Sequence, residues 1–187
     1  VGSVWLDPEM TSPYAFFQYW LNTDDKDVIN FLKVFSFKSH EEIASLEIKH
    51  NENPGLREAH RELARELTAL VHSSDVAARV EDAAKALFGQ GDLSQLDLPT
   101  LTSALSELPR TTVSSGQEIP TWVDLIAATG VIDSKSAARR IVKEGGAYLN
   151  NEKISGEDFR PSKTDFLCGK YAVLRKGKRE LAAVELL

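Results

Sequence analysis

Apolar residues recur at helical spacing through the first hundred residues. Ser12 stands before Pro13 and an aromatic run that ends at Leu21, which is the pattern of a capped helix with proline in its first turn. Strand signals are nearly absent before residue 110, so we predict an all-α helical bundle over residues 1–109. Five more helices are predicted at about residues 28–35, 39–50, 54–73, 74–87 and 99–108.

The pattern changes after residue 109. Residues 110–119 are polar and contain Gly and Ser, which predicts a linker with a partly extended backbone. Beyond it, the spacing of caps, glycines and alternating apolar residues predicts a small α+β module over residues 120–187. Its expected elements are helices over 121–128 and 134–144, a strand at 147–149, a turn at Asn150-Asn151 and a hairpin over 170–186.

Net charge separates the two parts. The 187 residues carry a net charge of −6, which by itself disfavours a nucleic-acid partner. Residues 1–119 hold 10 basic and 19 acidic side chains, whereas residues 120–187 hold 12 and 9. An acidic part joined to a basic part indicates a multi-domain chain whose modules have different partners.

Several classes of protein are excluded by composition. Cys168 is the single cysteine, so an internal disulfide is impossible. No apolar run approaches the roughly 20 residues of a membrane span, and Val1–Trp5 lacks the pattern of a signal peptide, so we expect a cytoplasmic chain without a membrane partner. The sequence begins with Val1 and not with an initiator methionine. We therefore expect it to be a piece of a longer protein.

The sequence contains no pattern of catalytic residues. Gly145-Gly146 lacks the spacing of a phosphate-binding loop, and no Gly-x-Ser-x-Gly motif is present. The four histidines lack the spacing of metal ligands, so we expect neither a metal nor a cofactor in this chain. His72 is near a helix C-terminus, where the dipole favours the imidazolium, and that interpretation is preferred to catalysis.

Acidic residues follow the aromatic helix. Asp24 or Asp25 is expected to cap the helix that starts near Val28. A carboxylate here can also accept hydrogen bonds from the amino or imino groups of a nucleobase, and the two roles are compatible.

Arginines at positions 57, 61 and 65 share one face of a predicted helix. Glu58 and Glu62 lie three residues before an arginine, so a self-neutralised, solvated face is expected. A track for backbone phosphates is the alternative.

The helix over residues 134–144 has a basic face. Lys135, Arg139 and Lys143 recur every fourth residue, beside Arg140, and few carboxylates neutralise them in the sequence. We therefore prefer RNA binding to a solvated face. Further cations and polar residues follow at Asn150, Lys153, Lys170, Arg175, Lys176, Lys178 and Arg179.

Two family resemblances narrow this interpretation. Residues 120–126, 134–141 and 145–150 resemble the RNA-binding module named after small-subunit ribosomal protein S-four. Residues 4–8, 11–14, 16–25 and 70–72 are similar to the anticodon-binding helical region of bacterial tyrosyl-tRNA synthetase, an enzyme of the class I aminoacyl-tRNA synthetases. The order of the two modules points to the C-terminal portion of that enzyme. One departure is Ser73, where relatives usually have glycine.

The resemblance implies a division of labour. It assigns the first anticodon base to Asp24, with Asp25 beside it, and assigns the anticodon stem and the long variable arm of tyrosine tRNA to Lys135, Arg139, Arg140, Lys143, Asn150 and Lys153. The parent ligase would activate tyrosine with ATP and Mg²⁺ and transfer it to tRNA in protein biosynthesis. We expect its catalytic domain to lie outside this chain. We expect the parent to be a homodimer and this fragment to be a monomer.

Two other functions stay open from the sequence. The chain could be a stand-alone S-four-like RNA-binding protein that acts on ribosomal RNA. It could also be a helical protein–protein adaptor with an incidental basic surface, which predicts no salt-dependent RNA binding.

Overall fold

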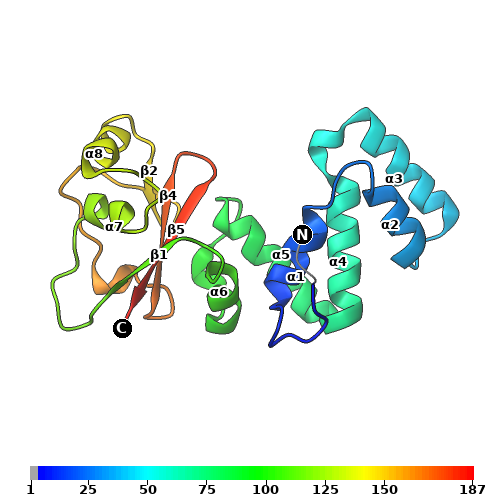
Figure 1. Ribbon diagram of the computed structural model, residues 1–187, viewed down its shortest axis with the longest axis horizontal. Coiled ribbons are helices and arrows are strands. Elements are labelled where there is room, and N and C mark those ends of the chain that lie inside the picture. Colours follow the sequence, from blue (N-terminus) through cyan, green and yellow to red (C-terminus); the bar gives the residue numbers. More distant parts are fainter. Residues whose placement is uncertain (1–3) are drawn as a thin grey trace. The chain divides into compact units, whose positions relative to one another are not determined.

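The computed structural model describes residues 4–187. Residues 1–3 lie outside it, so the structure bears on only part of the segment Val1–Trp5, in which the sequence shows no signal-peptide pattern. The chain divides into two compact units, one ending at Asp82 and the other spanning Ala83–Leu187. The described part of the first unit is helical, and the second combines helices with a mixed sheet (Figure 1). The predicted combination of a helical part and an α+β part is thereby confirmed. The division places residues 83–109, which we assigned to the helical domain, in the second unit.

The first unit is built from helices whose ends follow local capping rules. The Ser12 hydroxyl accepts the N–H of Ala15, and Ser39 forms a reciprocal capping box with Glu42, as predicted. The elements are α1 (Pro13–Leu21), α2 (Val28–Phe35), α3 (His40–Glu52), the 3₁₀ turn η1 (Pro54–Leu56), α4 (Glu58–His72) and α5 (Ser74–Leu87), which continues into the second unit.

Helix α4 organises the core of the first unit, because α1, α2 and α3 all pack against it. The apolar spacing along α4 places Ala59, Leu63 and Leu67 on one buried stripe. The remaining buried members of this core are Phe16, Val28, Ile29, Leu32, Ile43 and Leu46.

Two local expectations for this unit were wrong. Neither Asp24 nor Asp25 caps α2, which follows Asp27 without a side-chain cap. The predicted helix over 54–73 is interrupted because Arg57 has φ 51°, and the α-helix proper begins at Glu58. At its other end Ser73, which the sequence marked as a departure, has φ 127°, a conformation that favours glycine.

The second unit contains a five-stranded sheet in the order β1-β5-β4-β2-β3. Strand β1 runs parallel to β5, and the other neighbours are antiparallel. The elements are η2 (Leu93–Gln95), α6 (Leu98–Leu105), β1 (Arg110–Val113), α7 (Trp122–Ala128), α8 (Lys135–Lys143), β2 (Ala147–Leu149), β3 (Glu152–Lys153), η3 (Lys163–Asp165), β4 (Tyr171–Lys176) and β5 (Glu180–Leu186).

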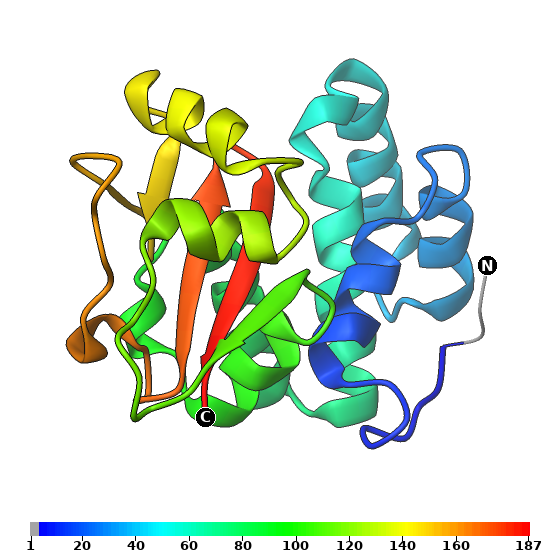
Figure 2. The same ribbon diagram turned by 60° about the vertical axis from the view of Figure 1, so that its left-hand side comes forward.

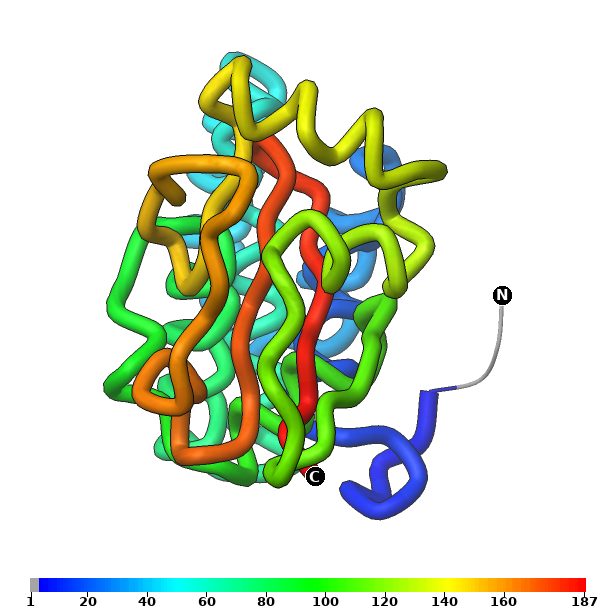
Figure 3. The backbone as a smooth tube through the Cα atoms, turned by 90° about the vertical axis from the view of Figure 1, so that its left-hand side faces the viewer, coloured from blue at the N-terminus to red at the C-terminus, as the bar shows by residue number. Residues whose placement is uncertain are grey.

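The sheet of the second unit is buried on both faces. Helix α7 covers one face with α8 beside it, and residues 83–109 lie on the other face (Figures 2 and 3). Alternation along β4 sends Leu174 toward α7, while Val173 points to the opposite face, and both are fully buried. Trp122 of α7 is also fully buried and donates its indole N–H to the carbonyl of Tyr148 over 3.0 Å.

The predicted linker is in part a strand. Arg110–Val113 pairs in register with Ala183–Leu186, so the start of residues 110–119 belongs to the sheet. Its β-branched Thr111, Thr112 and Val113 suit an extended backbone. Strand β1 lies at the edge of the sheet, where most of its side chains are exposed or half-buried. Polar residues are tolerated there, so composition alone did not indicate a strand.

The turn at Asn150-Asn151 formed as predicted. Both residues have positive φ, at 47° and 71°, which asparagine tolerates better than other non-glycine residues. None of the helices within residues 4–187 combines the length and the apolar character required to cross a bilayer.

Candidate nucleic-acid interface

Residues 22–27, which we call the acidic loop, join α1 to α2 and carry the exposed carboxylates of Asp24 and Asp25. The Asp24 side chain is 73% exposed, and its carboxylate lies 3.9 Å from the ammonium of Lys26. Asp25 is more engaged, because its Oδ1 lies 3.5 Å from Arg57 Nη1 and 3.1 Å from His60 Nε2. The structure therefore leaves Asp24 free to accept hydrogen bonds from an external donor, while Asp25, whose side chain is 57% exposed, also contacts Arg57 and His60.

The backbone of this loop is held from below by three side chains. Arg57 donates to the carbonyl of Leu21 over 2.6 Å. His60 contacts the carbonyl of Thr23 through Nε2 at 3.0 Å, and His50 contacts that of Asp25 in the same way at 3.0 Å.

Sequence reasoning missed the roles of these three residues at the loop. No local pattern could have found them, because Pro54 interrupts the helical register between His50 and His60. The two imidazoles meet only because α3 packs on α4.

The imidazole of His60 is held in its neutral form. Burial lowers its pKa first, and the positive charge of Arg57 and the proximity of His50 act in the same direction. The Asp25 carboxylate and the Thr23 carbonyl oppose them without reversing the shift. A neutral ring donates through one nitrogen only, so this side chain acts as a fixed hydrogen-bond donor.

His72 behaves differently from our expectation. It ends α4 and lies edge-on to Phe16 with ring centroids 5.2 Å apart. Burial lowers its pKa, so the imidazolium is disfavoured here although the helix C-terminus was predicted to favour it.

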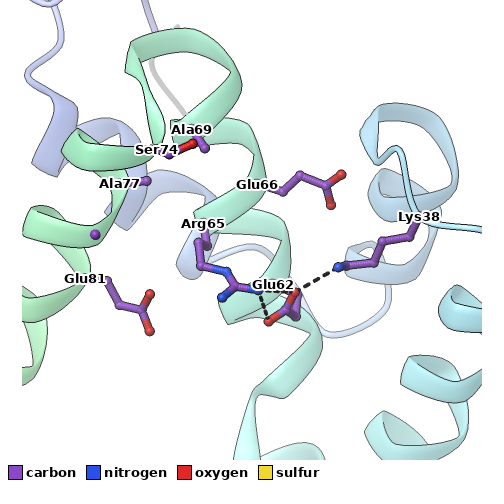
Figure 4. Close-up of a pocket in the computed structure, with 9 residues that line it drawn as sticks. Lys38, Glu62, Arg65, Glu66, Ala69, Ser74, Ala77 and Glu81 are labelled. Atoms are coloured by element: carbon purple, nitrogen blue, oxygen red, sulfur yellow. Dashed lines mark hydrogen bonds and ion pairs between the residues drawn. The ribbon is translucent and has the colours of Figure 1, made fainter.

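The arginines of positions 57, 61 and 65 do not form one row. Arg57 precedes α4 and turns toward the acidic loop, whereas Arg65 binds both oxygens of Glu62 at 2.8 Å. Glu62 also accepts from Lys38 at 3.0 Å, which places it between two cations beside a hollow of about 420 Å³ (Figure 4). Burial alone would raise the pKa of Glu62, but these two hydrogen bonds outweigh it and lower the pKa. The Glu62–Arg65 part of the predicted neutralised face is confirmed, and Glu58 pairs instead with Lys49 at 2.8 Å.

Helix α8 exposes the four predicted cations of the second unit. The side chains of Lys135, Arg139, Arg140 and Lys143 are 60%, 52%, 76% and 71% exposed. Ser134 caps the helix by accepting from the N–H of Ala137, and Ala138 and Val142 anchor its other face in the core.

Carboxylates neutralise α8 more than the sequence suggested. Lys135 lies 2.7 Å from Asp124 of α7, and Glu157 lies 3.6 Å from Arg139 and 3.2 Å from Lys143. Arg140 pairs with Glu144 at 3.8 Å. The expectation of few neutralising carboxylates was wrong because Asp124 and Glu157 are distant in sequence and arrive through the fold.

These ion pairs are weak enough to be exchanged. The hydrogen bonds from Lys135 and Thr121 lower the pKa of Asp124, so its carboxylate stays ionised near neutral pH. Exposed pairs of this kind contribute about 0–1 kcal/mol each, so a phosphate can replace the carboxylate at little cost. The face of α8 is therefore a set of cations with replaceable partners.

Two predicted contact residues beyond α8 have different environments. Asn150 is turned inward, since its amide donates to the carbonyl of Asp165 over 2.6 Å and accepts the N–H of Val173 over 2.8 Å. It holds the turn rather than presenting a free amide. Lys153 instead reaches the C-terminal end of α8, where a β-carbon at Gly145 would lie 2.5 Å from its Nζ.

The hairpin adds an arrangement that the sequence did not indicate. The guanidinium of Arg175 lies over the ring of Tyr148, 4.1 Å from the centroid, and donates to the carbonyl of Gly177 over 2.9 Å. Among residues 4–187 there is no group of three or more His, Cys, Asp or Glu side chains suited to a metal ion.

Known proteins resemble both units. Residues 2–89 match a family described as "tRNA synthetases class I (W and Y)", and residues 100–184 match one described as "Tyrosine--tRNA ligase SYY-like C-terminal domain". The chain is 57% identical over 185 residues to the tyrosine–tRNA ligase of Streptomyces avermitilis, which covers 99% of this chain and 43% of that protein. It is 53% identical over 186 residues to the tyrosine–tRNA ligase of Thermobifida fusca, with the same two shares covered.

A solved structure also matches in part. A C-terminally truncated mitochondrial tyrosyl-tRNA synthetase of Aspergillus nidulans is 34% identical, with a TM-score of 0.45, over 46% of this chain and 24% of that one. The chain spans less than half the length of the two curated bacterial relatives.

Proposed function

This chain belongs to the tyrosine–tRNA ligase family, and on that premise we propose that it is the tRNA-recognising part of such an enzyme. Its helical unit binds the anticodon, and its second unit, an S-four-like module, binds the anticodon stem and the long variable arm of tyrosine tRNA. The parent enzyme activates tyrosine with ATP and Mg²⁺ outside these residues, in the cytoplasm. The parent is a homodimer through its catalytic domain, and this part alone is a monomer.

The observation that carries the proposal is the environment of Asp24. Its carboxylate is 73% exposed, does not cap α2, and projects from a loop whose carbonyls are held by buried side chains. A carboxylate accepts hydrogen bonds but cannot donate them, so it selects bases that present N–H groups. An exposed acceptor on a fixed loop suits base recognition.

The face of α8 supplies attraction for the phosphates. It carries Lys135, Arg139, Arg140 and Lys143, whose carboxylate partners are replaceable. Phosphate contacts position a nucleic acid without reading its sequence, whereas base contacts provide the specificity. The two units therefore contribute different terms to the binding of one tRNA.

Replacement of Asp24 tests the anticodon assignment. We expect Asp24→Ala to reduce discrimination at the first anticodon base by about 1–3 kcal/mol, because the variant has no acceptor for the N–H groups of that base. The measurement is the ratio of Kd values for tyrosine tRNA and for a variant with a changed first anticodon base. Asp27→Asn is the control, since it removes a charge from the same loop at a position without a side-chain cap. Unchanged discrimination in Asp24→Ala would refute the assignment.

Removal of the variable arm tests the assignment of the second unit. Tyrosine tRNA that lacks this arm should bind more weakly and with a smaller salt dependence, because fewer phosphates reach the basic helix. Equal affinity for both tRNAs in a gel-shift titration would eliminate the variable-arm contact. Tighter binding to ribosomal RNA than to either tRNA would favour the stand-alone RNA-binding protein.

A further inference from the structure

Two histidines lie side by side beneath the acidic loop. His60 of α4 is fully buried and His50 of α3 is 9% exposed. Their ring centroids are 5.5 Å apart at an interplanar angle of 55°. Neither imidazole belongs to a cluster suited to a metal within the described residues, so their role has to be sought in the groups that they touch.

Both rings donate to the loop in the same way. The Nε2 atoms of His60 and His50 each lie 3.0 Å from a backbone carbonyl oxygen, those of Thr23 and Asp25. A carbonyl oxygen only accepts, so both Nε2 atoms must carry the proton. Both Nδ1 atoms are buried and have no hydrogen-bond partner among residues 4–187. The geometry thus places a proton on Nε2 of each ring and leaves Nδ1 without a partner.

Asp24 stands between the two carbonyls that the histidines hold. Arg57 fixes the carbonyl of Leu21 on the side of α1, and the carbonyl of Asp24 itself accepts the N–H groups of Asp27 and Val28 on the side of α2. The backbone on both sides of Asp24 is consequently restrained, while its carboxylate stays exposed. Restraint of this kind sets where an exposed acceptor can point.

We infer that His50 and His60 are positioning residues that fix the backbone of residues 23–25 and thereby hold the Asp24 carboxylate where it meets the first anticodon base. This inference rests on the proposed anticodon role of Asp24. It adds a requirement that the acceptor alone does not have, namely two imidazoles that donate to the loop carbonyls through Nε2.

Protonation is the natural way to break this arrangement. A second proton on His60 would create a buried Nδ1–H that has no acceptor. It would also put a positive charge close to Arg57 and His50. The charged and titratable groups that face His60 are Asp25 from the loop, His50 from α3 and Arg57 before α4. Asp25 is the single carboxylate in that set, and Arg57 already shares it. Mild acid should therefore loosen the loop and reduce the discrimination that Asp24 provides.

Paired substitutions separate the donor from the proton switch. His60→Gln keeps an N–H donor near the position of Nε2 and does not titrate, whereas His60→Leu removes the donor at similar volume. The matched pair His50→Gln and His50→Leu repeats the comparison on α3. His40→Gln, at the exposed start of α3, is the control.

The measurement is the ratio of Kd values for tyrosine tRNA and for the tRNA with a changed first anticodon base, taken with the whole chain at pH 7.5 and pH 5.5. Wild type and His40→Gln should lose discrimination about tenfold on acidification. His60→Gln should keep most of it at both pH values, and His60→Leu should lack it at both. Binding of the mismatched tRNA, which reports phosphate contacts, should change less than threefold among these variants.

Other outcomes overturn the inference. If His60→Gln and His60→Leu lower both affinities equally, the histidine is only structural. If discrimination is independent of pH in wild type and unaffected in His60→Leu, the imidazoles do not position Asp24. Ring ¹⁵N chemical shifts give a readout without tRNA, and Nδ1–H tautomers would also refute it. If the shifts report Nε2–H but wild type never discriminates between anticodons, the proposed function of Asp24 fails instead.

Discussion

The acidic loop and the basic helix α8 differ in the groups that contact them. In the first unit the acidic loop is supported by His60, which is fully buried, and by His50, which is nearly so. In the second unit the cations of α8 are paired with Asp124, Glu144 and Glu157, whose side chains are 35%, 66% and 30% exposed. When a hydrogen bond to a buried group breaks, that group is left without a partner, whereas an exposed group can bind water instead. The loop is therefore built for fixed geometry and α8 for exchange of partners.

Net charge follows the same division. With the boundary at residue 82, the first unit holds 8 basic and 15 acidic side chains, and the second holds 14 and 13. The basic character of the second unit is thus local to α8 and the hairpin and is not a property of the whole unit. The contrast between fixed and exchangeable partners can be tested on both units.

The largest effect should come from removing the exchangeable cations together. Replacing Lys135, Arg139, Arg140 and Lys143 by Ala should lower the affinity for tyrosine tRNA by roughly tenfold per phosphate contact at 0.1 M salt, or about a thousandfold for three contacts. The slope of log Kd against log salt should become shallower by about 0.9 for each phosphate that the variant no longer neutralises. Asp24→Ala is the control and should leave this slope unchanged. A quadruple variant with the wild-type slope would show that α8 does not meet phosphates.

The fixed region should respond to pH in the absence of tRNA. Burial lowers the pKa of His60 and of His72, so the unfolded chain binds more protons than the folded one once the pH falls below about 6.5. The free energy of unfolding should therefore decrease from pH 7.5 to 5.5, by about 1.4 kcal/mol for each unit of pKa difference. His60→Gln should flatten this dependence in denaturant titrations. A steeper dependence in that variant would contradict the assignment of a neutral imidazole.

Releasing the exchangeable cations should strengthen binding modestly. Glu157→Gln removes the carboxylate that lies near both Arg139 and Lys143. We expect about a fivefold tighter Kd for tyrosine tRNA, since a pair worth about 1 kcal/mol no longer competes with phosphate. Glu9→Gln makes the same change of net charge on an exposed residue of the first unit. Equal gains in both variants would attribute the effect to overall charge.

The smallest effect is expected where a surface pair lies in the helical unit. Lys33 and Glu47 are 3.2 Å apart with side chains 42% and 43% exposed. Lys33→Ala should change the free energy of unfolding by less than about 1 kcal/mol. Lys33→Met keeps the apolar stem and separates packing from charge. A larger loss in thermal unfolding would mean that exposed pairs count for more in this unit than in the second.

Local rules accounted for the elements but not for their partners. Ser12, Ser39, Thr121 and Ser134 all cap the helices that the sequence predicted, because capping depends on a few neighbouring residues. The place of β1 in the sheet was not predicted, because its partner strand β5 lies more than seventy residues further along the chain. The polar composition of residues 110–119 indicates that they are exposed, but it does not indicate which strand they pair with.

The candidate site divides along the same line. The exposed cations of α8 were predicted from their i, i+4 spacing, which fixes a helix face. Asn150 was predicted as a contact and proved to hold the turn, since both ends of its amide are used internally. The roles of Arg57, His50 and His60 were not predicted, because each depends on which carbonyl the packing brings within reach.

The sequence by itself determined the helices, their caps, the separation of acidic and basic parts and the family resemblance, because these depend on residues close together along the chain. The tertiary structure alone decided which charges are paired. It brought Glu157 to α8, Asp165 to the amide of Asn150, and His50 and His60 beneath the loop that carries Asp24. Hydrogen bonds and ion pairs act over a few ångströms in space, and only folding makes distant residues neighbours.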